Sequence, residues 1–318
     1  MTNAKNPFVS KTNFPWNRFP LKQKQKDALF AWFLLAPALI ILGLFVFFPI
    51  LQGIHFSFLE YTLETYQNPT WNNFANYIEL FESGEIFVYL RNTLVYVSGV
   101  VSVEFFIAFG LAMLLNADIK GRNLLRGLFL ISWVTPVVVG ALLWVWMLQP
   151  QYGVVNFLLA DLLHLIEPNQ TWTQHPQLAM ASVILATIWR QAPFMIVMFL
   201  AGLQSIPTSL LEAAKIDGAN ERNIVWHVIM PLMRPVIGTT VMITIINNFQ
   251  MFVIIYTMTQ GGPVDRTTTL SVGAFIEAFT RFNTGKGTAI GVIWLVILVL
   301  IALVFNKLII NRDEASSL

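Results

Sequence analysis

Residues 206–231 read IPTSLLEAAKIDGANERNIVWHVIMP, and this stretch indicates how the apolar chain around it is organised. Pro207 and Thr208 are typical of a helix start, and Thr208 or Ser209 can cap a helix that opens at Leu210. Apolar and polar residues then alternate at helical spacing. The apolar side comprises Leu210, Leu211, Ala214 and Ile216, and the polar side comprises Glu212, Lys215 and Asp217.

Gly218 is expected to end this first helix with a bend, and a second short helix is expected from about Asn220 to Met230. Pro231 then closes the segment where a long apolar run begins. Two short helices at a glycine bend form a compact knob that suits docking into a groove on another protein. The alternative, an ordinary amphipathic connector between two spans, is equally open on physical grounds.

The composition shows what surrounds this loop. The chain has 318 residues, of which 56% are hydrophobic and only 11% charged, whereas soluble domains carry about 25% charged residues. A bilayer must therefore be the solvent for most of the chain. The net charge of +2 gives no electrostatic case for nucleic acid, and the absence of cysteine excludes disulfides and thiolate chemistry.

Six runs are long and apolar enough to span a membrane as helices. The first follows a polar, basic N-terminal segment and is too long for a signal peptide, so we interpret it as a retained span. Arg91 and Glu104 interrupt the second. The six runs are Leu29–Phe58, Phe87–Leu115, Leu125–Leu148, Leu178–Leu203, Leu232–Met258 and Thr288–Ile310.

The basic residues predict the orientation, because cytoplasmic loops are enriched in Lys and Arg. Fourteen fall on the side of the two termini, and three fall in the loop after the fifth span. The fourteen are Lys5, Lys11, Arg18, Lys22, Lys24, Lys26, Lys120, Arg122, Arg126, Lys215, Arg222, Arg234, Lys307 and Arg312; the three are Arg266, Arg281 and Lys286. We therefore expect a cytoplasmic tail over 1–28, a six-span domain over 29–310 and a cytoplasmic tail over 311–318. The outer stretches Asn72–Phe81 and Val154–Leu165 are expected to form short interfacial helices.

The loop at 206–231 resembles the "EAA" loop of ABC importer membrane subunits. In that family a glycine follows Glu-Ala-Ala, and an Ile-x-Leu-Pro ending comes after it. The matching residues are Glu212, Ala213, Ala214, Asp217, Gly218, Ala219 and Pro231, whereas Val228 and Met230 depart conservatively from the Ile and Leu. The resemblance implies that this loop is the coupling helix, which sits in a cleft of a cytoplasmic ATPase.

Nearly the whole chain looks most like the carbohydrate-uptake branch of this family, the relatives of maltose and glycerol-phosphate importer subunits. The supporting segments are Asn92-Thr93-Leu94, residues 124–156, Ile188-Trp189-Arg190 with Pro193-Phe194, Thr259–Pro263 and Thr267–Leu270. The resemblance implies an all-α type I importer permease fold in a bacterial cytoplasmic (inner) membrane. It also implies a second homologous permease, two ABC ATPase subunits, an extracytoplasmic solute-binding protein and a sugar or sugar-like solute.

The chain carries no phosphate-binding loop, since Gly285-Lys286-Gly287 lacks the upstream glycine and the following Ser or Thr. We therefore expect no enzyme activity and no cofactor on this chain, with Mg-ATP bound by the partner ATPase. The four histidines show no metal-ligand spacing, so neither a metal site nor a catalytic constellation is expected.

Ionisable residues at membrane depth face protein or water. Glu104 and Arg190 lie near the middle of spans two and four, and they could form an ion pair that only holds the bundle together. Alternatively, Arg190 and Gln191 could lie in the translocation path and bond to solute hydroxyls. A basic residue after the Trp is frequent in this branch, so Arg190 does not imply an anionic substrate.

Span five contains Thr244, Asn247, Asn248 and Gln250, and positions 244, 247, 248 and 251 share one face of a continuous helix. That face could line a pore for a polyhydroxylated solute, or it could supply interhelical hydrogen bonds alone. By resemblance to maltose importers, the solute-contact positions are Trp133, Val137, Thr187, Arg190, Gln191, Phe194, Thr244, Asn248 and Met251.

Trp133 and Phe194 suit stacking on a sugar ring, whereas Val137 and Met251 are less polar than in the maltose relative.

The expected mechanism is alternating access driven by the partner ATPase. Two rivals stay open. An ion-gradient-driven secondary transporter would require inverted repeats and carboxylate relays, and a membrane scaffold would leave the polar face of span five unexplained.

Overall fold

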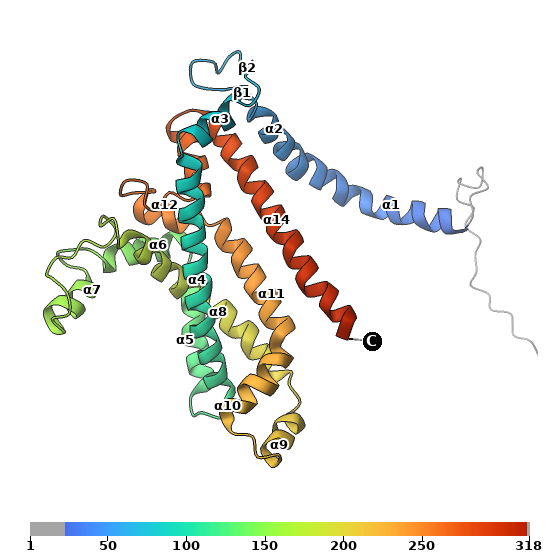
Figure 1. Cartoon of the computed structure of the whole chain (residues 1–318), viewed down its shortest axis with the longest axis vertical. Helices are drawn as coiled ribbons and strands as arrows, with labels where there is room; N and C mark the ends of the chain where they lie inside the picture. Colours follow the sequence, from blue (N-terminus) through green and yellow to red (C-terminus); the bar gives the residue numbers. More distant parts are fainter. Residues whose placement is uncertain (1–22, 317–318) are drawn as a thin grey trace, which may run out of the picture. The chain divides into compact units, whose positions relative to one another are not determined.

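The computed structural model describes residues 23–316, so the expected N-terminal tail lies largely outside the described residues (Figure 1). The chain divides into two units, Met1–Gln52 and Gly53–Leu318. The first contains α1 (Gln23–Leu42), the π-helical segment η2 (Gly43–Phe47) and the start of α2 (Phe48–Phe56). Together they form an apolar span over Asp27–Phe56, and no residue in its most apolar stretch is buried. A helix that is apolar all round must contact lipid or another protein.

The second unit is a helical bundle with a single small sheet among its described residues. Strand β1 (Leu59–Glu60) pairs antiparallel with β2 (Thr70–Trp71), with Leu59 opposite Trp71. The helices are α3 (Ala75–Glu82), α4 (Glu85–Asn116), α5 (Arg122–Val134), α6 (Val137–Met147), α7 (Val154–Asn156), η3 (Phe157–Leu162), α8 (Ala179–Gln204), α9 (Thr208–Ile216), α10 (Glu221–Ile224), η4 (Val225–Ile229), α11 (Met230–Phe249), α12 (Val253–Thr259), α13 (Leu270–Phe275), η5 (Ile276–Thr280) and α14 (Thr284–Ser316). The short outer helices expected near Asn72–Phe81 and Val154–Leu165 are present as α3 and as α7 with η3.

Five helices in the described part of the chain are long and apolar enough to cross a membrane, and a sixth span arises if the bent pair α5–α6 is counted as one. This count confirms the predicted six-span, all-α architecture. The third span differs from its prediction, because α5 and α6 meet at an angle of 98°. Thr135 is extended, with ψ of 128°. Pro136 disfavours a helical conformation in the residue before it, so the run Leu125–Leu148 cannot continue as one helix.

Span five also differs from the predicted Leu232–Met258. A continuous helix runs over Glu221–Phe249, and a break at residues 250–252 separates α11 from α12. The prediction that Pro231 closes a separate short helix is therefore wrong. Pro231 lies within this helix, directly after the π-helical segment η4 and Met230, so it does not separate two helices.

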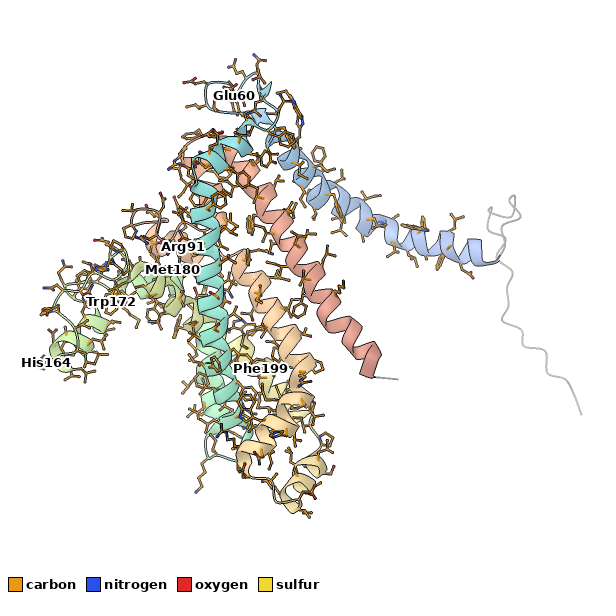
Figure 2. The ribbon with its side chains drawn as sticks, viewed as in Figure 1. Glu60, Arg91, His164, Trp172, Met180 and Phe199 are labelled. Carbon is orange, nitrogen blue, oxygen red and sulfur yellow. The ribbon has the colours of Figure 1, made fainter. Side chains whose placement is uncertain are left out.

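The core of this unit lies where α4 packs along α8. Buried residues recur on one face of α4 at intervals of four, and Ala108 and Ala112 let the helices approach closely. Phe199 of α8 meets Phe105 edge-on at 5.6 Å between ring centroids. Figure 2 shows Phe199 toward one end of the bundle and Arg91 toward the other. Arg91 lies exposed on α4, so this charge does not interrupt the core.

Candidate functional site

The EAA loop, residues 206–231, lies at the end of the bundle opposite to β1 and β2 (Figure 1). Its first helix, α9, ends before Gly218, which adopts φ of +82°. This left-handed conformation favours glycine over any residue with a Cβ. Asn220 then starts the next helix, where its Oδ1 accepts the backbone N–H of Asn223 at 2.8 Å. The predicted bend at Gly218 and the second helix start at Asn220 are confirmed.

Other local details of α9 differ from their predictions. The helix begins at Thr208 without a side-chain cap, so the predicted capping by Thr208 or Ser209 is wrong. Leu211 and Ala214 pack toward the core, but Leu210 is exposed and Ile216 is 86% exposed. The predicted apolar side is therefore divided between two faces of the helix.

The exposed surface of the loop is both acidic and apolar. Glu212 is exposed, and the ion pairs among the described residues do not include it. Lys215 lies 3.5 Å from Glu221 across the glycine bend. Of the remaining matched EAA residues, Ala213 and Asp217 are exposed and Ala219 is half-buried. An exposed carboxylate close to an exposed isoleucine, Ile216, is a surface that fits a groove with a basic rim.

Within the bundle, a polar network joins three spans. Tyr96 of α4 donates to Asn248 Oδ1 (3.3 Å), and its hydroxyl lies 3.0 Å from Thr187 Oγ1. Asn248 Nδ2 donates to Gln191 Oε1 (3.0 Å) and to the carbonyl of Thr244 (2.9 Å). Sequence reasoning missed Tyr96, although a phenol hydroxyl in an apolar span needs a partner. The network brings together four of the predicted path residues.

The residues of the network differ in how far their side chains are buried. Thr187, Thr244 and Asn248 are buried within the chain, whereas Gln191 is half-buried. The Gln191 oxygen accepts the bond from Asn248, and its amide nitrogen is left to donate elsewhere. Gln191 thus combines a fixed position with an available N–H donor.

The two ionisable residues of the spans do not meet. Glu104 is fully buried on α4, and neither of its oxygens has a hydrogen-bond partner among the described residues. The ion pairs among the described residues do not include Glu104 with Arg190, so the hypothesis of a structural pair between them is wrong. Arg190 is half-buried beside Gln191, and its Nε has no partner.

Trp133 and Phe194 bring α5 and α8 together, with ring centroids 6.3 Å apart and planes inclined by 33°. Trp133 remains 46% exposed. Val137 follows the bend between α5 and α6 as the first residue of α6. Phe194 lies on α8, about one turn after Arg190 and Gln191.

One member of the predicted face of span five, Met251, does not lie on the same helix as the others. Thr244 and Asn248 are buried, Asn247 and Gln250 are exposed, and Met251 lies beyond the end of α11. The face assumed a continuous helix, whereas the break at residues 250–252 changes the direction of the backbone.

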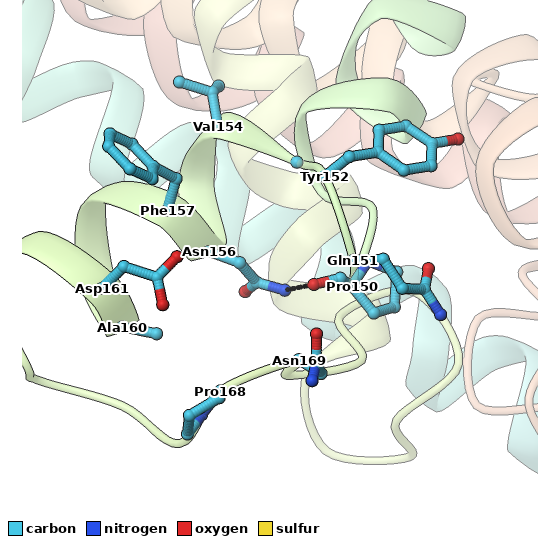
Figure 3. A pocket seen from close by; sticks show the side chains of 11 residues that line it. Pro150, Gln151, Tyr152, Val154, Asn156, Phe157, Ala160, Asp161, Pro168 and Asn169 are labelled. Carbon is cyan, nitrogen blue, oxygen red and sulfur yellow. Dashed lines mark hydrogen bonds between the residues drawn. The ribbon is translucent and has the colours of Figure 1, made fainter.

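A pocket of about 440 Å³ lies in the segment between α6 and α8, and none of the predicted path residues line it (Figure 3). Asn156 organises its floor. The Asn156 Nδ2 donates to the carbonyls of Pro150 and Gln170, both at 3.0 Å, and its Oδ1 accepts from Trp172 Nε1 at 2.7 Å. Asn156 therefore holds both ends of the segment together.

Apolar spans around a polar network, with a two-helix knob exposed at one end, define a membrane permease subunit. The chain belongs to the family described as binding-protein-dependent transport system inner membrane component, whose model matches residues 105–312. Members of this family are subunits of ABC transporters rather than enzymes, and ATP hydrolysis belongs to the partner ATPase.

Several relatives match over most of their length. The chain is 34% identical over 283 residues to the inner membrane ABC transporter permease protein YcjO of Escherichia coli, covering 89% of this chain and 95% of that one. It is 32% identical to the sulfoquinovosyl glycerol transport system permease SmoG of Agrobacterium fabrum, covering 90% and 92%. It is 30% identical to the trehalose/maltose permease MalF of Thermococcus litoralis, covering 92% and 97%.

The fold is shared with a solved structure. A chain of a bacterial ABC transporter involved in the import of the acidic polysaccharide alginate superposes with a TM-score of 0.77 at 23% identity. The match covers 91% of this chain and 99% of that one. Family and fold together make this chain a multi-pass membrane permease of the ABC importer class.

Proposed function

We propose that the chain is one of two homologous permease subunits of an ATP-driven importer that carries a sugar or sugar-like solute into the cytoplasm. Two ABC ATPase subunits bind Mg-ATP on the cytoplasmic side, and an extracytoplasmic binding protein delivers the solute. The sugar class is supported by relatives named for sulfoquinovosyl glycerol and for trehalose and maltose. An ion-gradient-driven transporter is not favoured, because the family is defined by binding-protein-dependent transport.

The EAA loop is the observation that carries the proposal. Its exposed Glu212 and Ile216 dock on the ATPase, and the Gly218 bend joins them to the continuous helix Glu221–Phe249. At 1.5 Å per residue, this helix of 29 residues extends about 40 Å. Movement of the docked knob therefore reaches Asn248 through one rigid element. ATP-driven closure of the ATPases opens the spans outward, and hydrolysis resets them.

The solute passes along the half-buried side chains next to the network. Gln191 and Arg190 donate hydrogen bonds to solute hydroxyls, and the rings of Trp133 and Phe194 stack on the sugar. We retain Val137, Thr187, Thr244, Asn247, Asn248, Gln250 and Met251 as the remainder of the path. The buried members position the exposed ones and form part of its wall.

Replacing Gln191 tests this path. Gln191→Leu removes an N–H donor from the path and the oxygen that accepts from Asn248, whose amide keeps its bond to the Thr244 carbonyl. We therefore expect an increase in the half-saturating sugar concentration of up to about tenfold. Basal ATP hydrolysis and assembly should stay at wild-type levels. The matched control is Gln204→Leu, because Gln204 is exposed at the other end of α8.

The measurement is uptake of a panel of radiolabelled mono- and disaccharides by the complex reconstituted with its ATPase and binding protein. ATP-dependent uptake of at least one sugar, weakened by Gln191→Leu and not by Gln204→Leu, supports the function and the path. Uptake that proceeds without ATP and collapses with an ionophore would instead identify an ion-driven transporter. Equal kinetics in both variants would remove Gln191 from the path.

The proposed orientation places both termini and the EAA loop in the cytoplasm. Reporter fusions after Asn116 or near Lys215 should therefore give a cytoplasmic signal, and fusions near Glu82 or Asn169 an exterior one. Paired alkaline phosphatase and green fluorescent protein reporters distinguish the two sides. A cytoplasmic signal from Asn169 would contradict the six-span topology.

A further inference from the structure

The loop between α12 and α13 is fastened to α4 by two neighbouring side chains. Asn92 Nδ2 donates to the carbonyl oxygens of Asp265 at 2.6 Å and Thr268 at 3.0 Å. Thr93 Oγ1 accepts the backbone N–H of Leu270 at 2.9 Å. These bonds join residues that are 173 to 177 positions apart in the sequence. They connect two sequence motifs, Asn92-Thr93-Leu94 and Thr267–Leu270, that have no role in the transport steps proposed above.

The loop itself is held rigid by its own threonines. Thr267 Oγ1 donates to the carbonyl of Gly262 at 2.8 Å, and Thr268 Oγ1 donates to the carbonyl of Gly261 at 2.9 Å. Both threonines are at most 1% exposed. Gly261 adopts φ of +88°, and a Cβ at this position would lie 2.6 Å from Thr268 Oγ1. Buried hydroxyls whose hydrogen bonds are satisfied make a loop rigid, so a displacement at one end of it displaces the other end.

The far end of the loop reaches the break in span five. Ser271 Oγ donates to the carbonyl oxygen of Met251 at 2.8 Å. Met251 lies between the end of α11 and the start of α12. The chain of contacts therefore runs from Asn92 on α4, through the rigid loop and Ser271, to the backbone of the break.

We propose that Asn92, together with Thr93, is a positioning residue that fixes the break in span five and so sets where Met251 stands. The importance of that placement for transport rests on the proposed function, in which Met251 lines the solute path. Asn92 acts through the loop and Ser271 and does not touch the solute. Its amide suits this role because one NH₂ group supplies two donors to two carbonyls of the loop.

Thiol labelling tests the proposal, since the chain contains no cysteine. Met251→Cys introduces the single thiol of this chain. The transporter is labelled with N-ethylmaleimide while assembled in vesicles, and the labelling rate is measured on this chain after it is separated from its partners. We expect Asn92→Leu and Ser271→Ala each to raise this rate by about fivefold, as a lost hydrogen bond loosens the break. Ser271→Thr keeps the hydroxyl and should restore the original rate. Ser98→Ala is the matched control on α4, because Ser98 is exposed and bonds only to its own helix.

A labelling rate that is unchanged in Asn92→Leu and Ser271→Ala would overturn the proposal. A second thiol placed at the fully buried Ala112 of α4 reports on general loosening. An equal rise in labelling at both positions would also overturn it, since a positioning role predicts a change at Met251 alone. Labelling requires no knowledge of the solute. A complex that fails to import any sugar would therefore count against the proposed function and leave the labelling result standing.

Discussion

Gly218→Pro is expected to reduce uptake to background while the chain still inserts in the membrane. Gly218 has φ of +82°, whereas the proline ring fixes φ near −65°. The substitution cannot keep the bend, so α9 is redirected relative to the helix that begins at Glu221. Gly218→Ala is the graded comparison: a Cβ meets nothing within 4 Å, and the left-handed backbone alone costs about 1–2 kcal/mol. Partial uptake by the alanine variant would show that the effect comes from the backbone conformation of the bend, since the added Cβ makes no steric contact within the chain.

The charge at Glu212 tests the same surface by a different route. Glu212 does not lie in the first turn of its helix, because α9 begins at Thr208. A favourable helix dipole therefore does not explain this carboxylate. Glu212 is exposed and takes part in none of the ion pairs among the described residues, so it is accessible to the ATPase on which we propose that it docks. Glu212→Lys should abolish coupled uptake, because repulsion replaces attraction at a basic rim, and Glu212→Ala should be milder.

Both loop variants are measured by co-purification with the ATPase and by solute-stimulated ATP hydrolysis beside uptake. Membrane insertion of each variant, followed by a C-terminal tag, is the control for folding. If Gly218→Pro and Glu212→Lys both behave as the wild type does, the EAA loop is an ordinary connector. The importer mechanism would then need a different coupling element.

The number and position of the spans could be predicted from the sequence because a run of about 20 apolar residues has few alternatives to a bilayer. Neither break was predicted, but one of the two has a local signal in the sequence. Pro136 stands at the bend between α5 and α6, and its effect on Thr135 is local. The break at residues 250–252 contains neither Gly nor Pro. It depends on Ser271 binding Met251 and on α12 packing against α6, and contacts between distant segments leave no local pattern.

The candidate site shows the same division between local and tertiary causes. The bend at Gly218 follows from one residue type, so it could be predicted. The exposure of Ile216 could not, because Leu210, Leu211 and Ile216 share one residue class and only the packed neighbours decide which of them faces the core. Likewise, the amide of Asn248 indicated a polar role, but its burial depends on Tyr96 of another span.

Lys286 was predicted to lie in the loop after the fifth span, but its side chain is buried in the structure. Lys286 lies in the first turn of α14, where its side chain is 7% exposed. Its Nζ lies 2.9 Å from a Glu79 oxygen and 2.8 Å from a Glu85 oxygen. Arg281 pairs with Glu277, which is 2% exposed, and lies 3.7 Å from Glu85. The cluster ties α14 to α3 and α4 at the end of the bundle opposite to the EAA loop.

Lys286→Met is accordingly expected to destabilise this unit. The methionine keeps most of the apolar stem but leaves Glu85 without its nearest cation. Lys286 is buried, but Glu79 and Glu85 are 57% and 31% exposed, so the loss lies between the roughly 1 kcal/mol of an exposed pair and the roughly 3 kcal/mol of a fully buried one. In a chain of this size, such a loss lowers the unfolding midpoint by roughly 2–6 °C.

Thermal unfolding of the purified chain in detergent, followed by circular dichroism, measures this shift. Lys307→Met is the matched control. It replaces the same type of side chain by the same residue, but at an exposed position of the same helix. Lys286→Arg keeps the charge and should recover most of the midpoint. If Lys286→Met and Lys307→Met unfold at the same temperature, the Coulombic gain of the cluster is balanced by its desolvation. The outer end of α14 would then be held by its apolar contacts alone.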